Sequence, residues 1–230
     1  EQVIGALKAR GLKGFWMGYF AGRAAPLGAV GPGVVEATFY NFDPSMVRRA
    51  IPDAWRFAEP VAVLEARSQA AAACLRRLAP AIDTEAERIV PLLSSAVRSG
   101  RADGRALFAA NQQLPLPDDP VAALWHCATA LREHRGDGHV ALLVAEDISG
   151  IEAHQLAVAA TGIPDDRLRG ARGWSEEAWS AAKATLGERG LLDETGALTD
   201  AGTALREQIE ARTDHLAIQP YTDGLTEPGL

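Results

Sequence analysis

The sequence predicts a mainly α-helical protein, and three observations support this. Alanine is abundant while aromatic residues make up only 6% of the chain, and alanine has the highest helix propensity. Apolar residues recur at helical spacing over long stretches, most clearly in 59–80 and 121–135. Ser, Thr or Asp precedes many of these stretches and Gly often follows them, as is typical of helix caps.

Composition sets limits on size, compartment and partners. The 230 residues suffice for one large domain or two small ones. A net charge of −7 and a pI near 5.3 oppose nonspecific attraction to nucleic acid, although a local basic patch stays open. Cys74 and Cys127 are expected to be buried, reduced thiols. We find no signal peptide and no membrane-length apolar run, and we expect a cytoplasmic protein without a cofactor.

The first helices are rich in aromatic residues and glycine. Phe15, Trp16, Tyr19 and Phe20 fall at helical spacing around Gly18 and Gly22. This pattern predicts either an aromatic core helix or the wall of a pocket with Arg23 as its charged member. Tyr40 and Asn41 stand beside two phenylalanines and are candidates for lining the same pocket.

Further helices follow up to a proline-rich segment. Asp43 and Pro44 begin one helix, and 59–80 forms a long one with Val63 inward and Arg67, Arg76 and Arg77 outward. Helices at 83–99 and 104–111 precede the polar, proline-rich segment 112–120. We therefore expect an N-terminal helical domain over 1–115.

The second half has the element order of a winged helix. The expected elements are helix 121–135, a tight turn at Gly136 to Gly138, helix 139–146, helix 150–161 behind a capping box, an arginine-rich loop 165–172, helix 175–189, a short hairpin and helix 200–215. This order predicts a MarR-type winged helix-turn-helix over 116–219 with a short β-hairpin wing, followed by a flexible tail over 220–230. A similar rhythm in the first half leaves tandem, diverged winged helices open.

Several motifs carry a resemblance that covers nearly the whole chain. The motifs are FWMGYFAGRAAPLG, ALWH, LREHRGDGHVALL and RGWS with a following RGLL. With them the chain resembles an actinobacterial family labelled helix-turn-helix or SalK-like. The resemblance implies the fold more than a chemistry. It also implies a further helix ahead of the first residue, because family members usually carry one.

The expected DNA-reading helix has an acidic outward face. Direct readout needs Arg, Lys, Asn or Gln there, whereas the face presents Glu176, Glu177, Ser180, Lys183 and Glu188, and the hairpin adds Asp193 and Glu194. The preceding segment does bring Arg167, Arg169 and Arg172. We therefore disfavour DNA as a partner and keep a MarR-like DNA-binding regulator as an alternative.

Titratable residues concentrate around the expected turn at Gly136. They either form structural ion pairs and caps or line a pocket for an anionic or aromatic molecule, with His134 and His139 as candidate acid–base catalysts. The spacing matches no metal motif. The candidate ligand-binding residues are Tyr19, Arg23, Tyr40, Asn41, Trp125, His126, Arg132, Asp137, His154 and Trp174.

These observations favour a winged-helix-derived protein that binds a small organic ligand. It would be either a sensor or a biosynthetic enzyme with histidine acid–base chemistry. A protein-interaction module without catalysis is a further alternative. A homodimer is open, since MarR-type proteins dimerise through helices at both ends of the domain.

Overall fold

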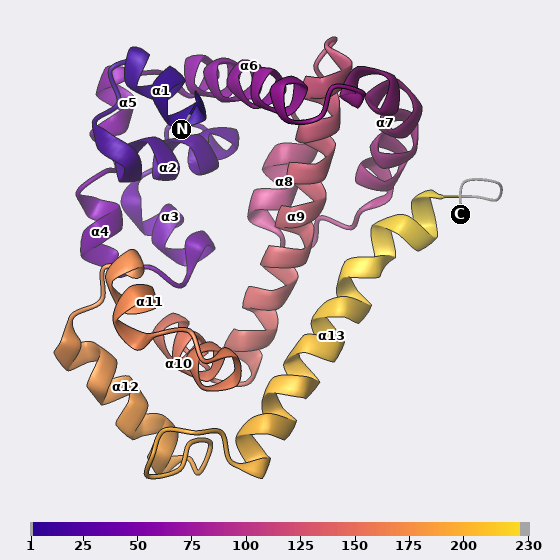
Figure 1. Ribbon diagram of the computed structural model, residues 1–230. Coiled ribbons are helices and arrows are strands. Elements are labelled where there is room, and N and C mark those ends of the chain that lie inside the picture. Colours follow the sequence, from indigo (N-terminus) through magenta and orange to yellow (C-terminus); the bar gives the residue numbers. More distant parts are fainter. Residues whose placement is uncertain (1, 226–230) are drawn as a thin grey trace.

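The computed structural model describes residues 2–225, and Figure 1 shows how their helices are arranged. The elements are α1 (Gln2–Ala9), α2 (Gly14–Ala24), the 3-10 helix η1 (Ala25–Leu27), α3 (Pro32–Phe39), α4 (Pro44–Arg48), α5 (Ala54–Phe57), α6 (Pro60–Leu78), α7 (Ile82–Ser99), α8 (Ala106–Gln112), α9 (Pro120–Ala145), α10 (Gly150–Thr161), α11 (Asp165–Arg172), α12 (Glu176–Glu188) and α13 (Asp200–Gly224). The predicted mainly α-helical fold is confirmed.

Short helices at the N-terminal end share one apolar core. Helices α1 to α5 bury residues such as Phe20, Val35 and Ile51, all fully inaccessible, and α6 packs against α1 and α2. The aromatic residues of α2 lie edge-on against one another and against Phe42, and Phe20 stacks on Phe39. Such contacts stabilise beyond the area that they bury, and this cluster gives the short helices a common centre.

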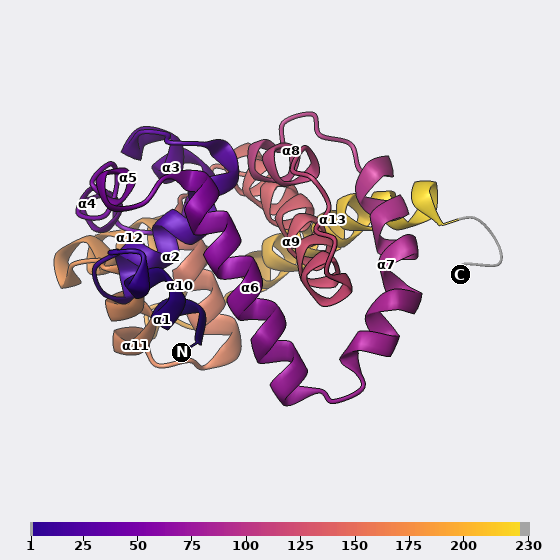
Figure 2. The ribbon, with the colours of Figure 1, turned by 90° about the horizontal axis from the view of Figure 1, so that it is seen from above.

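Helix α9 is the central helix of the molecule. It packs against α6, α7, α8 and α13, which approach it along its length (Figures 1 and 2). Near its start Val121 and Ala122 bury against Ala72 of α6 and Ala86 of α7. Further along, Cys127 and Leu131 bury against Phe108 of α8 and Val97 of α7. Elements from both sides of the 112–120 segment thus meet on one helix.

The segment expected to form a helix-turn-helix, α10 to α12, lies at the far end of α9 (Figure 1). Helices α10, α11 and α12 follow α9, and their core includes Leu156, Leu186 and Ile209. Ser149 and Glu152 form the predicted capping box, and Ser175 caps α12. The expected β-hairpin wing does not form as strands: within residues 2–225 the connection holds a single antiparallel bridge between Leu192 and Leu198. The segments are too short to extend the pairing.

The predicted turn at Gly136 to Gly138 is wrong, because α9 runs unbroken to Ala145. Glycine in a helix interior costs about 1 kcal/mol relative to alanine, which the packing of α8 and α13 on this helix outweighs. A β-carbon at Gly138 would lie 3.6 Å from Arg105 Nη2 and 3.7 Å from Leu216 Cδ1, which are ordinary van der Waals contacts.

Two further expectations are corrected. The arginine-rich segment 165–172 is not a loop but helix α11, which Gly173 ends in the left-handed conformation. The expected flexible tail from 220 begins as helix, because α13 continues through Pro220 to Gly224. Ser95 Oγ donates to the Gly224 carbonyl at 2.7 Å and so holds this end on α7. Residues 226–230 lie outside the described residues.

The domain boundary at 115/116 and the tandem arrangement stay predictions. The bridge at Leu192 is the only β pairing within residues 2–225, so the described N-terminal half contains no second wing. Over the same residues, every helix is too short or too polar to cross a membrane.

Candidate functional site

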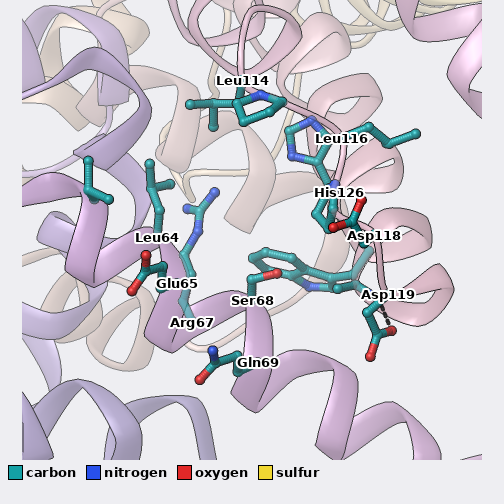
Figure 3. A pocket seen from close by; sticks show the side chains of 15 residues that line it. Leu64, Glu65, Arg67, Ser68, Gln69, Leu114, Leu116, Asp118, Asp119 and His126 are labelled. Atoms are coloured by element: carbon teal, nitrogen blue, oxygen red, sulfur yellow. Dashed lines mark hydrogen bonds between the residues drawn. The ribbon is translucent and has the colours of Figure 1, made fainter.

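A large cavity opens between α6, the segment 113–119 and the start of α9. Its volume is about 730 Å³, within the range of about 300–1,000 Å³ that is typical of small-molecule sites. Figure 3 shows side chains of α6 on one wall and side chains of α9 and the preceding segment on the other. The lining is Val61, Leu64, Glu65, Arg67, Ser68, Gln69, Leu114, Pro115, Leu116, Pro117, Asp118, Asp119, Ala122, Trp125 and His126.

Arg67 is the buried cation of this cavity. It was expected to face outward, yet it is only 6% exposed, because it lies one helical turn after the buried Val63. Its Nη1 donates to the Gly22 carbonyl, while its Nε is buried and has no hydrogen-bond partner among the described residues. Burial lowers its pKa to about 10, so the guanidinium remains charged at neutral pH. Its Cζ lies 5.0 Å from the centre of the Trp125 ring, within the range of a cation–π contact.

A second, smaller cavity lies on the other side of Arg67 and Trp125. Its volume is about 300 Å³, and α1, α2, α6 and α9 surround it. Arg67 and Trp125 line both cavities and separate them. The lining of the second cavity is Val3, Ile4, Leu7, Gly18, Tyr19, Gly22, Arg23, Arg67, Trp125, Thr129, Arg132 and Glu133.

An ion-pair cluster forms one wall of the second cavity. Arg23 Nε and Nη2 donate to the two carboxylate oxygens of Glu133 at 3.0 and 2.8 Å, and Arg132 Nη1 donates to the same carboxylate at 2.8 Å. The Glu133 side chain is 2% exposed. Burial acts to lower the pKa of Arg23, but the hydrogen bonds and charge of Glu133 outweigh it and raise that pKa. Two guanidinium groups thus share the Glu133 carboxylate, and Arg67 lines the same cavity without pairing with it.

The mouth and the interior of the larger cavity differ in charge. Glu65 and Asp118 are exposed carboxylates on its lining, and Asp119 pairs with Arg76 at 2.9 Å. His126 lies inside, and burial followed by the nearby charge of Arg67 lowers its pKa. The cavity is therefore acidic at its rim, apolar along its walls and positively charged inside.

The structure brings together some of the predicted ligand-binding residues. Tyr19, Arg23, Trp125 and Arg132 line the smaller cavity, and Trp125 and His126 line the larger one. Sequence reasoning missed Glu133, the carboxylate that joins two of these arginines, and Arg67. The helical spacing from Val63 to Arg67 was the signal that would have placed that arginine on the inner face of α6.

His134, Asp137 and His139 lie on α9 away from both cavities. His134 is 1% exposed, packs edge-on against Phe108 at 4.8 Å and has no hydrogen-bond partner for either ring nitrogen among the described residues. Burial lowers its pKa to about 4. Burial raises the pKa of Asp137, which accepts from the Phe108 amide at 2.9 Å, to about 6. His139 Nδ1 lies 2.9 Å from Thr213 Oγ1 of α13, and burial lowers its pKa.

The remaining predicted residues join the N-terminal helices to the helix-turn-helix. The Asn41 carbonyl lies 3.1 Å from His154 Nε2 and accepts from Trp174 Nε1 at 3.2 Å. Tyr40 donates to the Ile148 carbonyl at 2.5 Å. Burial lowers the pKa of His154 to about 4. The polar side-chain atoms at this junction thus have backbone carbonyls as hydrogen-bond partners. Tyr40, Asn41, His154 and Trp174 line neither cavity.

The turn of the helix-turn-helix is itself in contact with the N-terminal helices. The Asp43 amide donates to the Arg172 carbonyl at 2.9 Å. Met46 packs so closely on Gly173 that a β-carbon there would lie 2.9 Å from its sulfur. In DNA-reading proteins the first residues of the following helix meet the base edges. Here those residues are the exposed Glu176 and Glu177, so the N-terminal end of α12 is acidic.

No cluster of three or more His, Cys, Asp or Glu residues suited to a metal ion occurs in the part of the chain that the structure describes. The site is therefore defined by its two cavities, their shared Arg67 and Trp125, and the Arg23–Glu133 pair.

Comparison with known proteins identifies the family. The family model described as "Helix-turn-helix family" matches residues 1–228. The chain therefore belongs to this helix-turn-helix family. No curated protein matches the chain, and no solved structure matches it.

Proposed function

We propose that this helix-turn-helix protein binds a small organic molecule in the cavity between α6 and the start of α9. The observation that carries the proposal is the cavity itself, whose volume of about 730 Å³ and apolar walls suit a molecule with an aromatic or alicyclic body. Helix α6, the segment before α9 and the start of α9 form the site, and the helix-turn-helix lies at the other end of α9. The proposal contains no catalytic step, because His134 and His139 lie outside both cavities.

A fluorescent apolar dye tests this proposal. Phenylnaphthylamine is uncharged and brightens when it leaves water, so we expect saturable binding to the wild-type protein. Ser68 lines the cavity on α6 (Figure 3), and Ser68→Trp places a large side chain in it. We expect this variant to bind the dye at least about tenfold more weakly, since it excludes the dye from apolar surface.

A matched substitution controls for surface effects. Ser180 is exposed on α12, far from the cavity lining, so Ser180→Trp adds the same side chain elsewhere. We expect this variant to bind the dye as the wild type does. Equal binding by Ser68→Trp and the wild type would show that the dye does not enter this cavity and would overturn the proposal.

DNA binding is the second candidate function, and membership of the helix-turn-helix family favours it. Helix α11 carries Arg167, Arg169 and Arg172, which could meet phosphates. Two observations disfavour DNA binding: the start of α12 is acidic, and Met46 covers the turn before it at Gly173. Fluorescence anisotropy with random duplex DNA at low salt distinguishes the two candidate functions. Tight binding that weakens steeply with salt and with Arg167→Ala would favour DNA binding as the function. We expect the protein not to bind the duplex.

A further inference from the structure

We propose that the ligand of this cavity is an organic monoanion whose anionic group is received by Arg67. This inference rests on the proposed function and names the class of molecule that the site takes. The anionic group would lie beside Trp125, where the two cavities meet, and the apolar body would extend along the walls of the larger cavity.

The first step is the uncompensated charge of Arg67. A buried cation costs several kcal/mol of desolvation unless it is paired, and Arg67 is 6% exposed without a carboxylate partner among the described residues. The Gly22 carbonyl, the Trp125 ring and the more distant charge of Glu133 supply partial compensation only. Nε is closed off from solvent, whereas the outer Nη2 has no hydrogen-bond partner among the described residues and is the donor that a molecule in the cavity can reach. An anion there would form a charge-assisted hydrogen bond, the strongest kind in proteins.

The surrounding charges favour a single anionic group. Arg23 is already paired through Nε and Nη2 with Glu133. Arg132 pairs with the same carboxylate, and its side chain is 65% exposed to water. Arg67 is therefore the one buried guanidinium of this group that lacks a carboxylate. A carboxylate or sulfonate would match its charge.

The acidic rim disfavours polyanions. Glu65 and Asp118 lie exposed on the cavity lining, and a di- or polyphosphate entering there would meet two like charges. The walls beyond Arg67 are apolar, with Leu64 on α6 and Leu114 and Leu116 in the segment before α9 (Figure 3). A nucleotide therefore fits poorly, whereas an aromatic acid can place its anionic group at Arg67 and its ring against the apolar walls.

Two dyes that differ by one charged group test the inference. Anilinonaphthalene sulfonate has the aromatic skeleton of phenylnaphthylamine with an added sulfonate. We expect Arg67→Met to weaken binding of the sulfonate dye by about tenfold or more, the loss of one charge-assisted hydrogen bond. The ratio of the affinity for the sulfonate dye to the affinity for the uncharged dye should therefore fall by about tenfold, because only the sulfonate dye uses the guanidinium. Arg67→Lys keeps the charge without the planar donor fork, and we expect an intermediate loss for the sulfonate dye.

Competition and folding controls complete the experiment. Unchanged helical circular dichroism and saturable binding of the uncharged dye show that each variant is folded. Benzoate should displace the sulfonate dye and pyrophosphate should not. Displacement by pyrophosphate, or equal binding of the sulfonate dye by Arg67→Met and the wild type, would overturn this inference and leave the proposed function standing. If the wild type bound neither dye, both the proposed function and this inference would be overturned.

Discussion

The two ends of α9 carry similar residues in different surroundings. Near its start Trp125 and His126 face open cavities, with Arg67 of α6 beside them. Further along, His134 and Asp137 are enclosed by α8 and α13 and touch neither cavity. A cluster of titratable residues therefore does not by itself make a ligand-binding site. Neighbouring helices decide whether the cluster meets a ligand or becomes part of the core.

The largest expected effect is at the enclosed end. Phe108 is fully buried against His134, and Phe108→Ala should lower the free energy of unfolding by about 3–5 kcal/mol, because it leaves a cavity. Trp125 already borders open cavities, so Trp125→Ala should cost only about 1–2 kcal/mol. Urea unfolding measures both. Equal losses would mean that the two ends are packed alike.

The ion pair beside the smaller cavity gives the next largest effect. Glu133→Gln removes the carboxylate that neutralises the mostly buried Arg23 and should lower the free energy of unfolding by about 3 kcal/mol. Glu210→Gln breaks the exposed pair with Arg135 and should cost less than about 1 kcal/mol. Chemical denaturation of both variants at one pH provides the comparison. A loss for Glu133→Gln no larger than that for Glu210→Gln would contradict the structural role of this pair.

The pH dependence of stability probes His134. Its pKa of about 4 in the folded state lies below the ordinary value of 6.5, so the unfolded chain binds more protons between these values. Stability therefore rises with pH through this window and falls on acidification. From pH 7.5 to 5, the wild type should lose about 2 kcal/mol relative to His134→Leu, which cannot titrate.

Unfolding free energies at the two pH values measure this difference. At pH 7.5 His134→Leu should be as stable as the wild type or slightly more so, because it removes two unpaired buried nitrogens. Parallel losses of stability in the two proteins on acidification would mean that His134 titrates normally and is not enclosed.

The glycines of α9 give the smallest effect. Ala in place of Gly136 or Gly138 should raise the free energy of unfolding by about 0.5–1 kcal/mol, since both lie within a continuous helix and a β-carbon meets only ordinary contacts. Thermal unfolding measures the change. A marked loss of stability in both variants would favour the tight turn that the sequence had suggested.

Helix positions were largely predictable because their signals are local. The capping box at Ser149 and Glu152 and the cap at Ser175 sit where expected. The turn at Gly136 and the loop at 165–172 were not, because a weak local preference for non-helical backbone was outweighed by packing. The extent of strand pairing in the hairpin was overestimated, because a turn signal does not determine how many residues pair beyond Leu192.

The candidate site was predictable only in part. Tyr19, Arg23, Trp125 and Arg132 do converge, as the pattern suggested. Their common partner Glu133 follows Arg132 in the chain and was interpreted only as part of an ion-pair network. Arg67 was assigned to the wrong face, because arginine on an alanine-rich helix is usually solvated.

By itself the sequence determined the helical class, the order of the helices, most of their ends and the acidic face of α12. These depend on caps, periodicity and charge within one helix or turn. Only the tertiary structure decided that α9 is unbroken, that Arg67 is buried between two cavities and that His134 is enclosed. Such features depend on which helices pack together, so a local pattern such as the spacing of Arg67 from Val63 indicates them only in part.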